Sequence, residues 1–185
     1  MKKHYKTDYF EKLCNISKIC NENFSYVYKI LASQEIPPEK IFLKSKDIVI
    51  EINECLEKDY FTPFEREDIF IISKKLDILN DYLYLLFIFL SENNFFSFTK
   101  NTINQIEHLS DLSTIIHEIF ISLSVSQKNN LSKHIADAEI IHQNLIRQIY
   151  SENSKNAPVY HYIEKCTDTS NEIIQLIQYT LLKNS

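Results

Sequence analysis

The chain has 185 residues, enough for a domain with a full hydrophobic core. It contains no glycine and only four prolines, which excludes Asn-Gly and Gly-Gly hairpins and the glycine-rich loops that bind dinucleotides or phosphates. The net charge of −5, with no basic block, argues against a nucleic-acid-binding protein. These exclusions favour an all-α fold.

Apolar residues recur along the chain at alternating three- and four-residue spacing, which is typical of helices with one buried face. The pattern predicts six helices. In chain order they cover about residues 10–31, 41–60, 62–92, 102–123, 131–149 and 158–181. Short connections between them favour antiparallel neighbours. We therefore expect one domain, residues 1–185, built as a six-helix bundle from two up-and-down three-helix repeats, about 1–93 and 97–185.

Several local signals fix the expected helix ends. Pro37-Pro38 suit the first turn of the second helix. Thr62-Pro63-Phe64-Glu65 predicts the start of the third helix, with Thr62 as the N-cap, proline in the first turn and Glu65 completing a capping box. Asn93-Asn94 is expected to close that helix, and Gln127-Lys128-Asn129-Asn130 is predicted to be a turn.

Cysteine usage and the distribution of apolar residues indicate the compartment. The cysteines form no Cys-x-x-Cys pair or secretory spacing, so we expect reduced thiols. Asp8 and Glu11 stand where a signal peptide needs an apolar run. The longest apolar stretch, Tyr82 to Leu90, is about half the length of a membrane span and predicts a buried helix centre. We expect a cytoplasmic protein, either free or peripheral to the inner membrane.

Two pairs of carboxylates lie beside the apolar stripes. Asp77 and Asp81 are four residues apart in the third helix, as are Glu164 and Asp168 in the sixth, so each pair shares one helix face. Burying such a pair is costly unless a cation neutralises it. Close carboxylates can hold hard cations or clusters of iron or manganese. The alternative is that both pairs simply face water.

Glu139 and His142 form a Glu-x-x-His motif, which is half of the ferritin-like di-iron signature. The second half is missing from the sequence. His142 also falls on an apolar stripe, which favours a core histidine with a hydrogen-bond partner. No pattern in the sequence indicates a catalytic centre, so we do not expect an enzyme. A carboxylate-bound metal enzyme, such as a hydrolase or an oxidase, is the least supported alternative.

One segment resembles a known family. The run FTPFEREDI, Phe61 to Ile69, followed by LDILND, Leu76 to Asp81, is similar to the FITPFDREDI and LDDVxD hallmark of the divergent PhoU-like family. The ending Tyr162 to Asp168 is similar to that family's LExxTD. These proteins are encoded beside the low-affinity phosphate transporter Pit. The resemblance implies a doubled three-helix bundle that regulates phosphate transport, with a Pit-type transporter at the cytoplasmic membrane face as its partner. A homo-oligomer is compatible with it.

The resemblance also implies metal clusters held by Glu/Asp-x-x-x-Asp motifs. Asp77 with Asp81 and Glu164 with Asp168 match two of the four motifs. In the fifth helix the last acid of the motif falls on Glu139, but Ile135 replaces the first.

In the second helix the motif is lost. Its last position falls on Lys46 or Asp47, and its first on Phe42 or Leu43. A lysine at that site would oppose a metal ion. The metal ligands predicted on this basis are Asp77, Asp81, Glu139, Glu164 and Asp168, with the firmer site in the second repeat, where Glu139, Glu164 and Asp168 could converge. The ion would be iron, manganese, zinc or another hard divalent ion, or none. A metal-free interaction bundle that has lost the clusters is the alternative.

Overall fold

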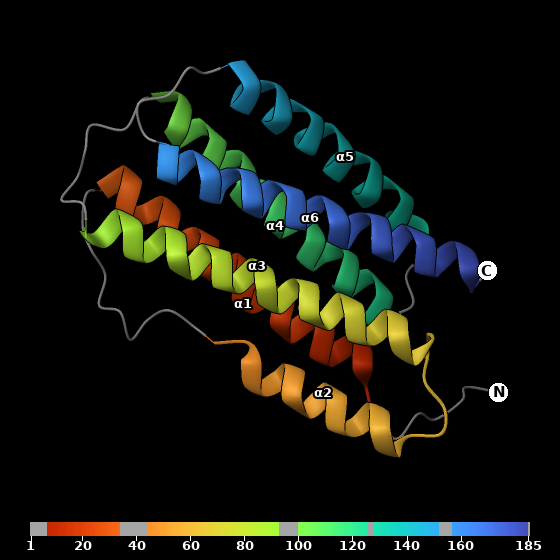
Figure 1. The fold of residues 1–185 in the computed structure, drawn as a ribbon. Helices are drawn as coiled ribbons and strands as arrows, with labels where there is room; N and C mark the ends of the chain where they lie inside the picture. The colour runs from red at the N-terminus through yellow and green to blue at the C-terminus, as the bar shows by residue number, and fades with distance from the viewer. Residues whose placement is uncertain (1–6, 34–43, 93–99, 126–127, 152–156, 185) are drawn as a thin grey trace.

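The computed structural model describes residues 7–33, 44–92, 100–125, 128–151 and 157–184 (Figure 1). These ranges contain helices and no strand, which confirms the predicted all-α fold. The helices are α1 (Tyr9–Ser33), α2 (Lys46–Lys58), α3 (Arg66–Glu92), α4 (Lys100–Ser124), α5 (Lys128–Ser151) and α6 (Ala157–Lys183).

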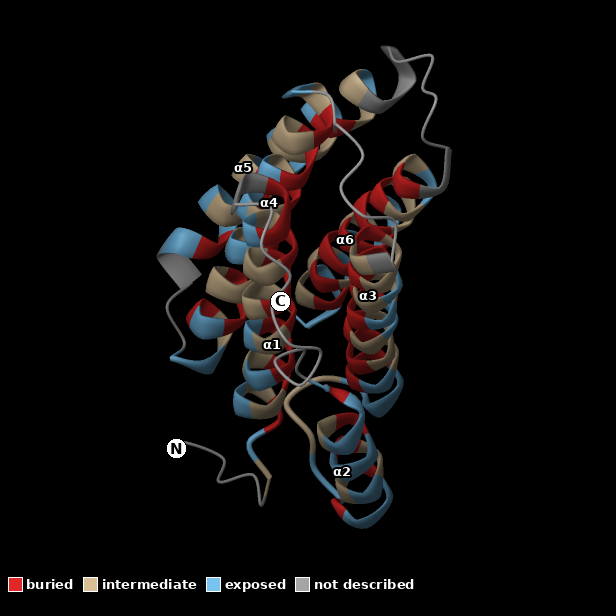
Figure 2. Ribbon diagram, turned by 90° about the vertical axis from the view of Figure 1, so that its left-hand side faces the viewer, coloured by how far each residue is buried: buried red, intermediate tan, exposed pale blue. Residues whose placement is uncertain are grey.

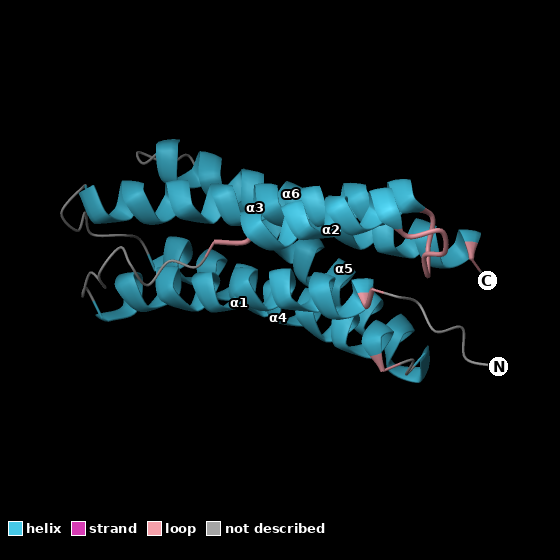
Figure 3. Cartoon of the chain, turned by 90° about the horizontal axis from the view of Figure 1, so that it is seen from below, coloured by secondary structure: helices cyan, strands magenta, loops and turns pink. Residues whose placement is uncertain are grey.

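Four long helices form the centre of the bundle. α1 packs mainly on α4, and α3 packs mainly on α6, so the N-terminal and C-terminal halves of the chain contact each other through these two pairs of helices. Viewed from below, α1 and α4 form one layer and α3 and α6 the other (Figure 3). The short α2 lies outside this centre, along α3 and α1, while α5 covers α4 and α6 (Figure 1).

The core lies between the two layers (Figure 2). α3 shows why the sequence folds this way, because Leu76, Leu79, Leu83 and Leu86 recur at helical spacing and are all fully buried. Each such side chain contributes about 1.5–3 kcal/mol when it is removed from water. Within the stretch from Tyr82 to Leu90, predicted to be a buried helix centre, Leu83, Leu86, Phe87 and Leu90 are buried, whereas Leu85 is 43% exposed. In the described part of the chain, no helix combines the length and the apolar character needed to cross a bilayer.

The start of α3 differs from the prediction. The helix begins at Arg66, and Thr62 donates its hydroxyl hydrogen to the carbonyl of Phe64 at 2.5 Å, so it is not an N-cap. The predicted capping box is wrong because its glutamate has a tertiary partner. The carboxylate of Glu65 accepts a hydrogen bond from Lys183 of α6. The Arg66 guanidinium meanwhile donates to the carbonyl of Asp59, which fixes the chain just before the helix.

Two other predicted boundaries also move. α2 begins at Lys46, later than the expected start near Ile41, and Pro37-Pro38 lie outside the described residues. α5 begins at Lys128, so the predicted turn at Lys128–Asn130 is wrong. Gln127 and Asn93-Asn94 also lie outside the described residues.

Candidate functional site: two acid pairs and their neighbours

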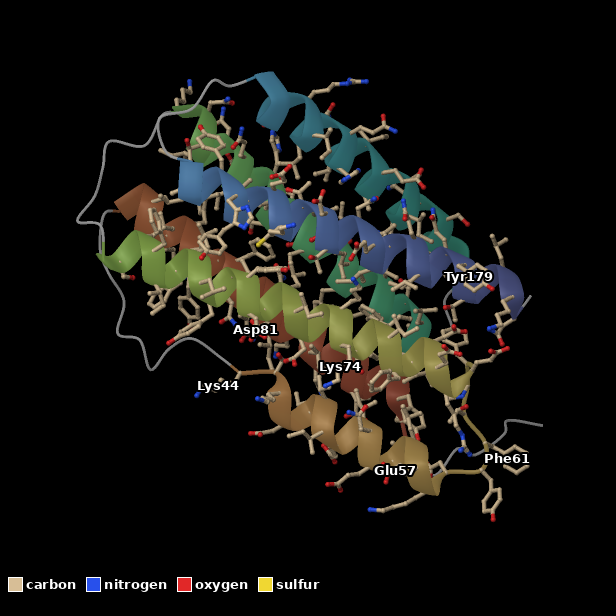
Figure 4. All side chains as sticks on the ribbon, in the orientation of Figure 1. Lys44, Glu57, Phe61, Lys74, Asp81 and Tyr179 are labelled. Carbon is tan, nitrogen blue, oxygen red and sulfur yellow. The ribbon has the colours of Figure 1, made fainter. Side chains whose placement is uncertain are left out.

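The first acid pair lies on α3, where the N-terminal end of α2 meets it (Figure 4). Asp77 is half-buried and accepts a hydrogen bond of 2.6 Å from the Ser45 hydroxyl, while Asp81 is exposed. Although Asp81 is exposed as a residue, neighbouring protein atoms partly desolvate its carboxyl and raise its pKa, and the charge of Asp77 raises it further. The ammonium of Lys46, the first residue of α2, acts in the opposite direction.

Asp77 is the end of a buried chain of hydrogen bonds. Asn23 of α1 donates to Asn80 of α3 at 2.6 Å, and the Asn80 amide donates to the Ser45 hydroxyl at 3.2 Å. Ser45 then donates to Asp77. We call these four residues the polar relay. It joins three helices across the side of the bundle to which α2 attaches.

The polar relay was not predicted from the sequence. The available signal was weak: Asn80 sits between Leu79 and Asp81, so its burial depends on how α2 and α1 cover α3. The spacing of residues in the sequence shows which side chains share one face of a helix, but it does not show which other helix covers that face.

The second acid pair lies on α6 and faces α5. Glu164 is half-buried and Asp168 is exposed. Although Asp168 is exposed as a residue, neighbouring protein atoms partly desolvate its carboxyl and raise its pKa, and the charge of Glu164 raises it further. The neighbour from α5 is His142, whose own pKa is lowered by burial and raised back in part by Asp168. The structure therefore brings His142 to this pair.

Glu139 has a different partner. Its carboxylate accepts a hydrogen bond of 2.7 Å from the side-chain amide of Gln178. Gln178 lies ten residues after Asp168 on α6, which corresponds to about 15 Å along the helix axis. The Glu139 carboxylate is thus directed toward the C-terminal half of α6 and does not join the second pair.

These contacts test whether the residues fit a metal cluster. Within the described ranges, no three His, Cys, Asp or Glu side chains lie together in an arrangement that could hold a metal ion. The first pair already has a hydroxyl donor and a neighbouring ammonium. The second pair has a histidine nitrogen, from His142, where the family motif has a third carboxylate, so fewer negative charges would balance a cluster of cations. The described residues do not fit a cluster, and metal binding through the five predicted ligands stays a prediction.

A third polar group lies between α1 and α4. The Ser17 hydroxyl donates to the carbonyl of Cys14 at 2.9 Å, so the Nδ1–H of His117 donates to the Ser17 oxygen, also at 2.9 Å. The Cys14 sulfur is 3.8 Å from the same nitrogen. Burial raises the pKa of the Cys14 thiol, so the thiolate needed for nucleophilic attack is disfavoured. This group holds α1 against α4.

Two further thiols are enclosed in the core. Cys20 and Cys166 are at most 1% exposed, and burial raises the pKa of both. The Cys20 thiol donates to the carbonyl of Leu76 at 3.4 Å. Both are free thiols in the structure.

The helix order and the pairing of α1 with α4 and α3 with α6 define an all-α helical bundle in the described part of the chain. Within that class the fold is PhoU-like. A PhoU-like phosphate regulatory protein from Shewanella oneidensis MR-1 aligns with a TM-score of 0.62 and 10% identity, over 95% of this chain and 100% of that one. A second PhoU-like protein from the same organism aligns with a TM-score of 0.57 and 13% identity, over 95% and 96%. No family model and no curated protein matches the sequence. The resemblance found in the sequence is confirmed at the level of the fold.

Proposed function

We propose that this protein is a regulator or accessory protein of inorganic phosphate transport and is not an enzyme. The observation that carries the proposal is the fold, which is shared over 95% of the chain with a protein described as a PhoU-like phosphate regulatory protein. The FTPFEREDI segment supports it from the sequence. The partner in this proposal is a Pit-type phosphate transporter at the cytoplasmic face of the membrane.

Deleting the gene tests the proposal. The measurements are the initial rate of radiolabelled phosphate uptake and the expression of phosphate-responsive genes, in phosphate-rich and phosphate-poor medium. We expect at least one to change, and the wild-type chain supplied in trans to restore it. Both unchanged in both media would refute the proposal.

A second form of the proposal is a metal-free bundle that acts only through protein contacts. Three observations favour it: Lys46 lies beside the first acid pair, Glu139 is hydrogen-bonded to Gln178, and the described residues form no three-ligand group. In the metal-binding form, Glu164 and Asp168 would hold an ion of iron, manganese, zinc or another hard metal, with His142 as the nearest nitrogen donor.

Elemental analysis separates the two forms. The protein is purified without chelators or metal-affinity resin and compared with a Glu164→Ala/Asp168→Ala variant. Glu107 and Asp111 of α4 provide a matched control, since both are exposed and also four residues apart. Stoichiometric metal that is lost only from the α6 variant would support metal-linked regulation. No metal in any of the three proteins would leave the metal-free bundle.

A further inference from the structure

One end of the bundle exposes large apolar side chains. The loop between α2 and α3 and the last turns of α6 meet there, joined by the contacts of Lys183 with Glu65 and Asp68. The exposed side chains are Tyr60 (91%), Phe61 (73%), Tyr179 (58%) and Leu182 (77%). Single exposed apolar residues are ordinary on protein surfaces. Tyr60 and Phe61 are adjacent in one loop, so together their exposed rings offer a partner more apolar contact surface than a single side chain does. We call Tyr60 and Phe61 the aromatic tip.

The loop that carries the aromatic tip is held in place. The carboxylate of Asp59, 6% exposed, accepts a hydrogen bond of 2.9 Å from the Tyr9 hydroxyl, and its backbone N–H donates to the carbonyl of Cys55. On the other side of the tip, the Phe64 ring packs edge-to-face on Phe10, with centroids 5.1 Å apart. A partner would therefore meet side chains on a fixed backbone, which lowers the entropic cost of binding.

An acidic groove lies next to this loop, between the start of α1 and α2. It encloses about 350 Å³. Its lining residues are Thr7, Asp8, Glu11, Lys12, Asn15, Glu51 and Cys55. Three carboxylates thus face one ammonium, and that ammonium, of Lys12, is already paired with Glu51 at 2.7 Å. The groove has excess negative charge.

The groove and the tip are neighbours, because Cys55 lines the groove and its carbonyl binds the first residue of the loop. Glu57, also exposed, lies near the end of α2 outside the groove (Figure 4), and the exposed Lys58 that follows it has its ammonium 3.8 Å from Glu54. An anionic lipid surface would be repelled by these acids. A cationic chain carrying apolar side chains would find both complementary charge and an aromatic contact.

We propose that the acidic groove and the aromatic tip together bind a segment of a partner protein that carries Lys or Arg beside aromatic or aliphatic residues. The basic side chains occupy the groove between α1 and α2, and an apolar side chain packs on Tyr60 and Phe61. Aromatic anchors at the centre of an interface typically carry most of its binding energy. This inference does not depend on a role in phosphate transport, and a negative result in phosphate uptake would leave it intact.

The test begins with phage-displayed random 12-residue peptides selected on the full-length chain. Enriched peptides are synthesised with a fluorescent label, and their affinity is measured by anisotropy for three variants and the wild type. Tyr60→Ser/Phe61→Ser removes the tip, and Glu11→Gln/Glu51→Gln neutralises the groove. The control, Ile140→Ser with Glu107→Gln, removes an exposed apolar and an exposed acidic side chain from the α4 and α5 side of the bundle. Circular dichroism confirms that each variant is folded.

We expect enriched peptides to combine basic and apolar residues, with affinity falling about tenfold or more in both the tip and groove variants, equivalent to about 1.4 kcal/mol. The control should change affinity less than about twofold, and salt should weaken wild-type binding. No enrichment, acidic consensus peptides, or binding that survives the tip variant would each overturn the proposal. The proposal would also be overturned if the protein bound no peptide but floated with phosphatidylcholine vesicles in a way that required the aromatic tip. That result would show that the surface binds membranes.

Discussion

We expect the removal of a single oxygen atom from the polar relay, by the substitution Ser45→Ala, to reduce the stability of the protein substantially. Ser45→Ala deletes the hydroxyl that donates to Asp77 at 2.6 Å and accepts from the Asn80 amide at 3.2 Å. Ser45 is only 1% exposed, so water cannot readily replace these bonds. The backbone there is right-handed helical, with φ −94° and ψ −17°, which alanine adopts without strain.

The magnitude follows from the two bonds. A hydrogen bond to a charged group contributes about 1.5–3 kcal/mol, and a neutral one about 0.5–1.5 kcal/mol. Ser45 precedes α2 but makes no side-chain capping bond, so no capping energy is lost. Because Asp77 is only half-buried, we take the lower end of the energy range for the hydrogen bond from Ser45 to its carboxylate. We expect a loss of about 2–3 kcal/mol in the free energy of unfolding.

Urea unfolding followed by circular dichroism measures this loss, with Ser132→Ala at an exposed position of α5 as the control. A double-mutant cycle with Asp77→Ala isolates the bond itself. In the Asp77→Ala background, Ser45→Ala should cost less by about 1 kcal/mol or more. A loss below about 0.5 kcal/mol in the wild type, or the same loss in both backgrounds, would refute the reasoning.

Three other changes have expected outcomes. Gln105→Met should raise the free energy of unfolding by about 1 kcal/mol in urea titrations, because both amide atoms of Gln105 are fully buried and have no hydrogen-bond partner among the described residues. Burial lowers the pKa of His117, so the unfolded chain binds the proton more readily and stability should fall as pH drops below about 6.5; His117→Gln should flatten this dependence in urea midpoints between pH 8 and pH 5. Lys46→Asp should create manganese binding near Asp77 and Asp81, measured by isothermal titration calorimetry.

Each of these predictions has a matched control. Gln143→Met, at an exposed position, should leave stability nearly unchanged, and an equal gain there would contradict the burial argument. For His117, an unchanged slope in the variant would assign the pH dependence to other groups. Lys44→Asp adds the same charge just before α2; manganese binding by that variant alone, or by neither, would show that Lys46 is not what opposes a cation.

The helices and their buried faces could be predicted because periodicity reports burial directly. The stripe of α3, from Leu76 to Leu90, lies in the core as expected. The errors fall where distant residues compete with a local signal. Thr62 to Glu65 has the composition of a helix start, but Lys183 takes the carboxylate that a capping box needs. The residues next to Glu65 in the sequence give no indication that Lys183 contacts its carboxylate.

The site was harder to predict for the same reason. Each acid pair shares a helix face, which the sequence shows, but the facing residue comes from another helix whose rotation it does not show. Glu139 and His142 are three residues apart on α5, and the sequence does not show which of them lies near Asp168. In the structure His142 is the neighbour of Asp168, and Glu139 is bonded to Gln178. At α2 the sequence did not decide between Lys46 and Asp47, and in the structure the charge of Lys46 is close enough to Asp81 to lower its pKa.

The two buried thiols, Cys20 and Cys166, allow opening movements of the bundle to be followed by their rate of alkylation. Cys20 and Cys166 come from opposite repeats, yet both are sealed between the layers, so an alkylating reagent reaches them only when the layers separate. Cys55 on the outer helix α2 and Cys14 at the contact of α1 with α4 are half-buried, and both should react through smaller local movements, Cys55 when α2 detaches. The order in which the four sulfurs are modified would therefore distinguish detachment of an outer helix from separation of the two halves, without introducing any label.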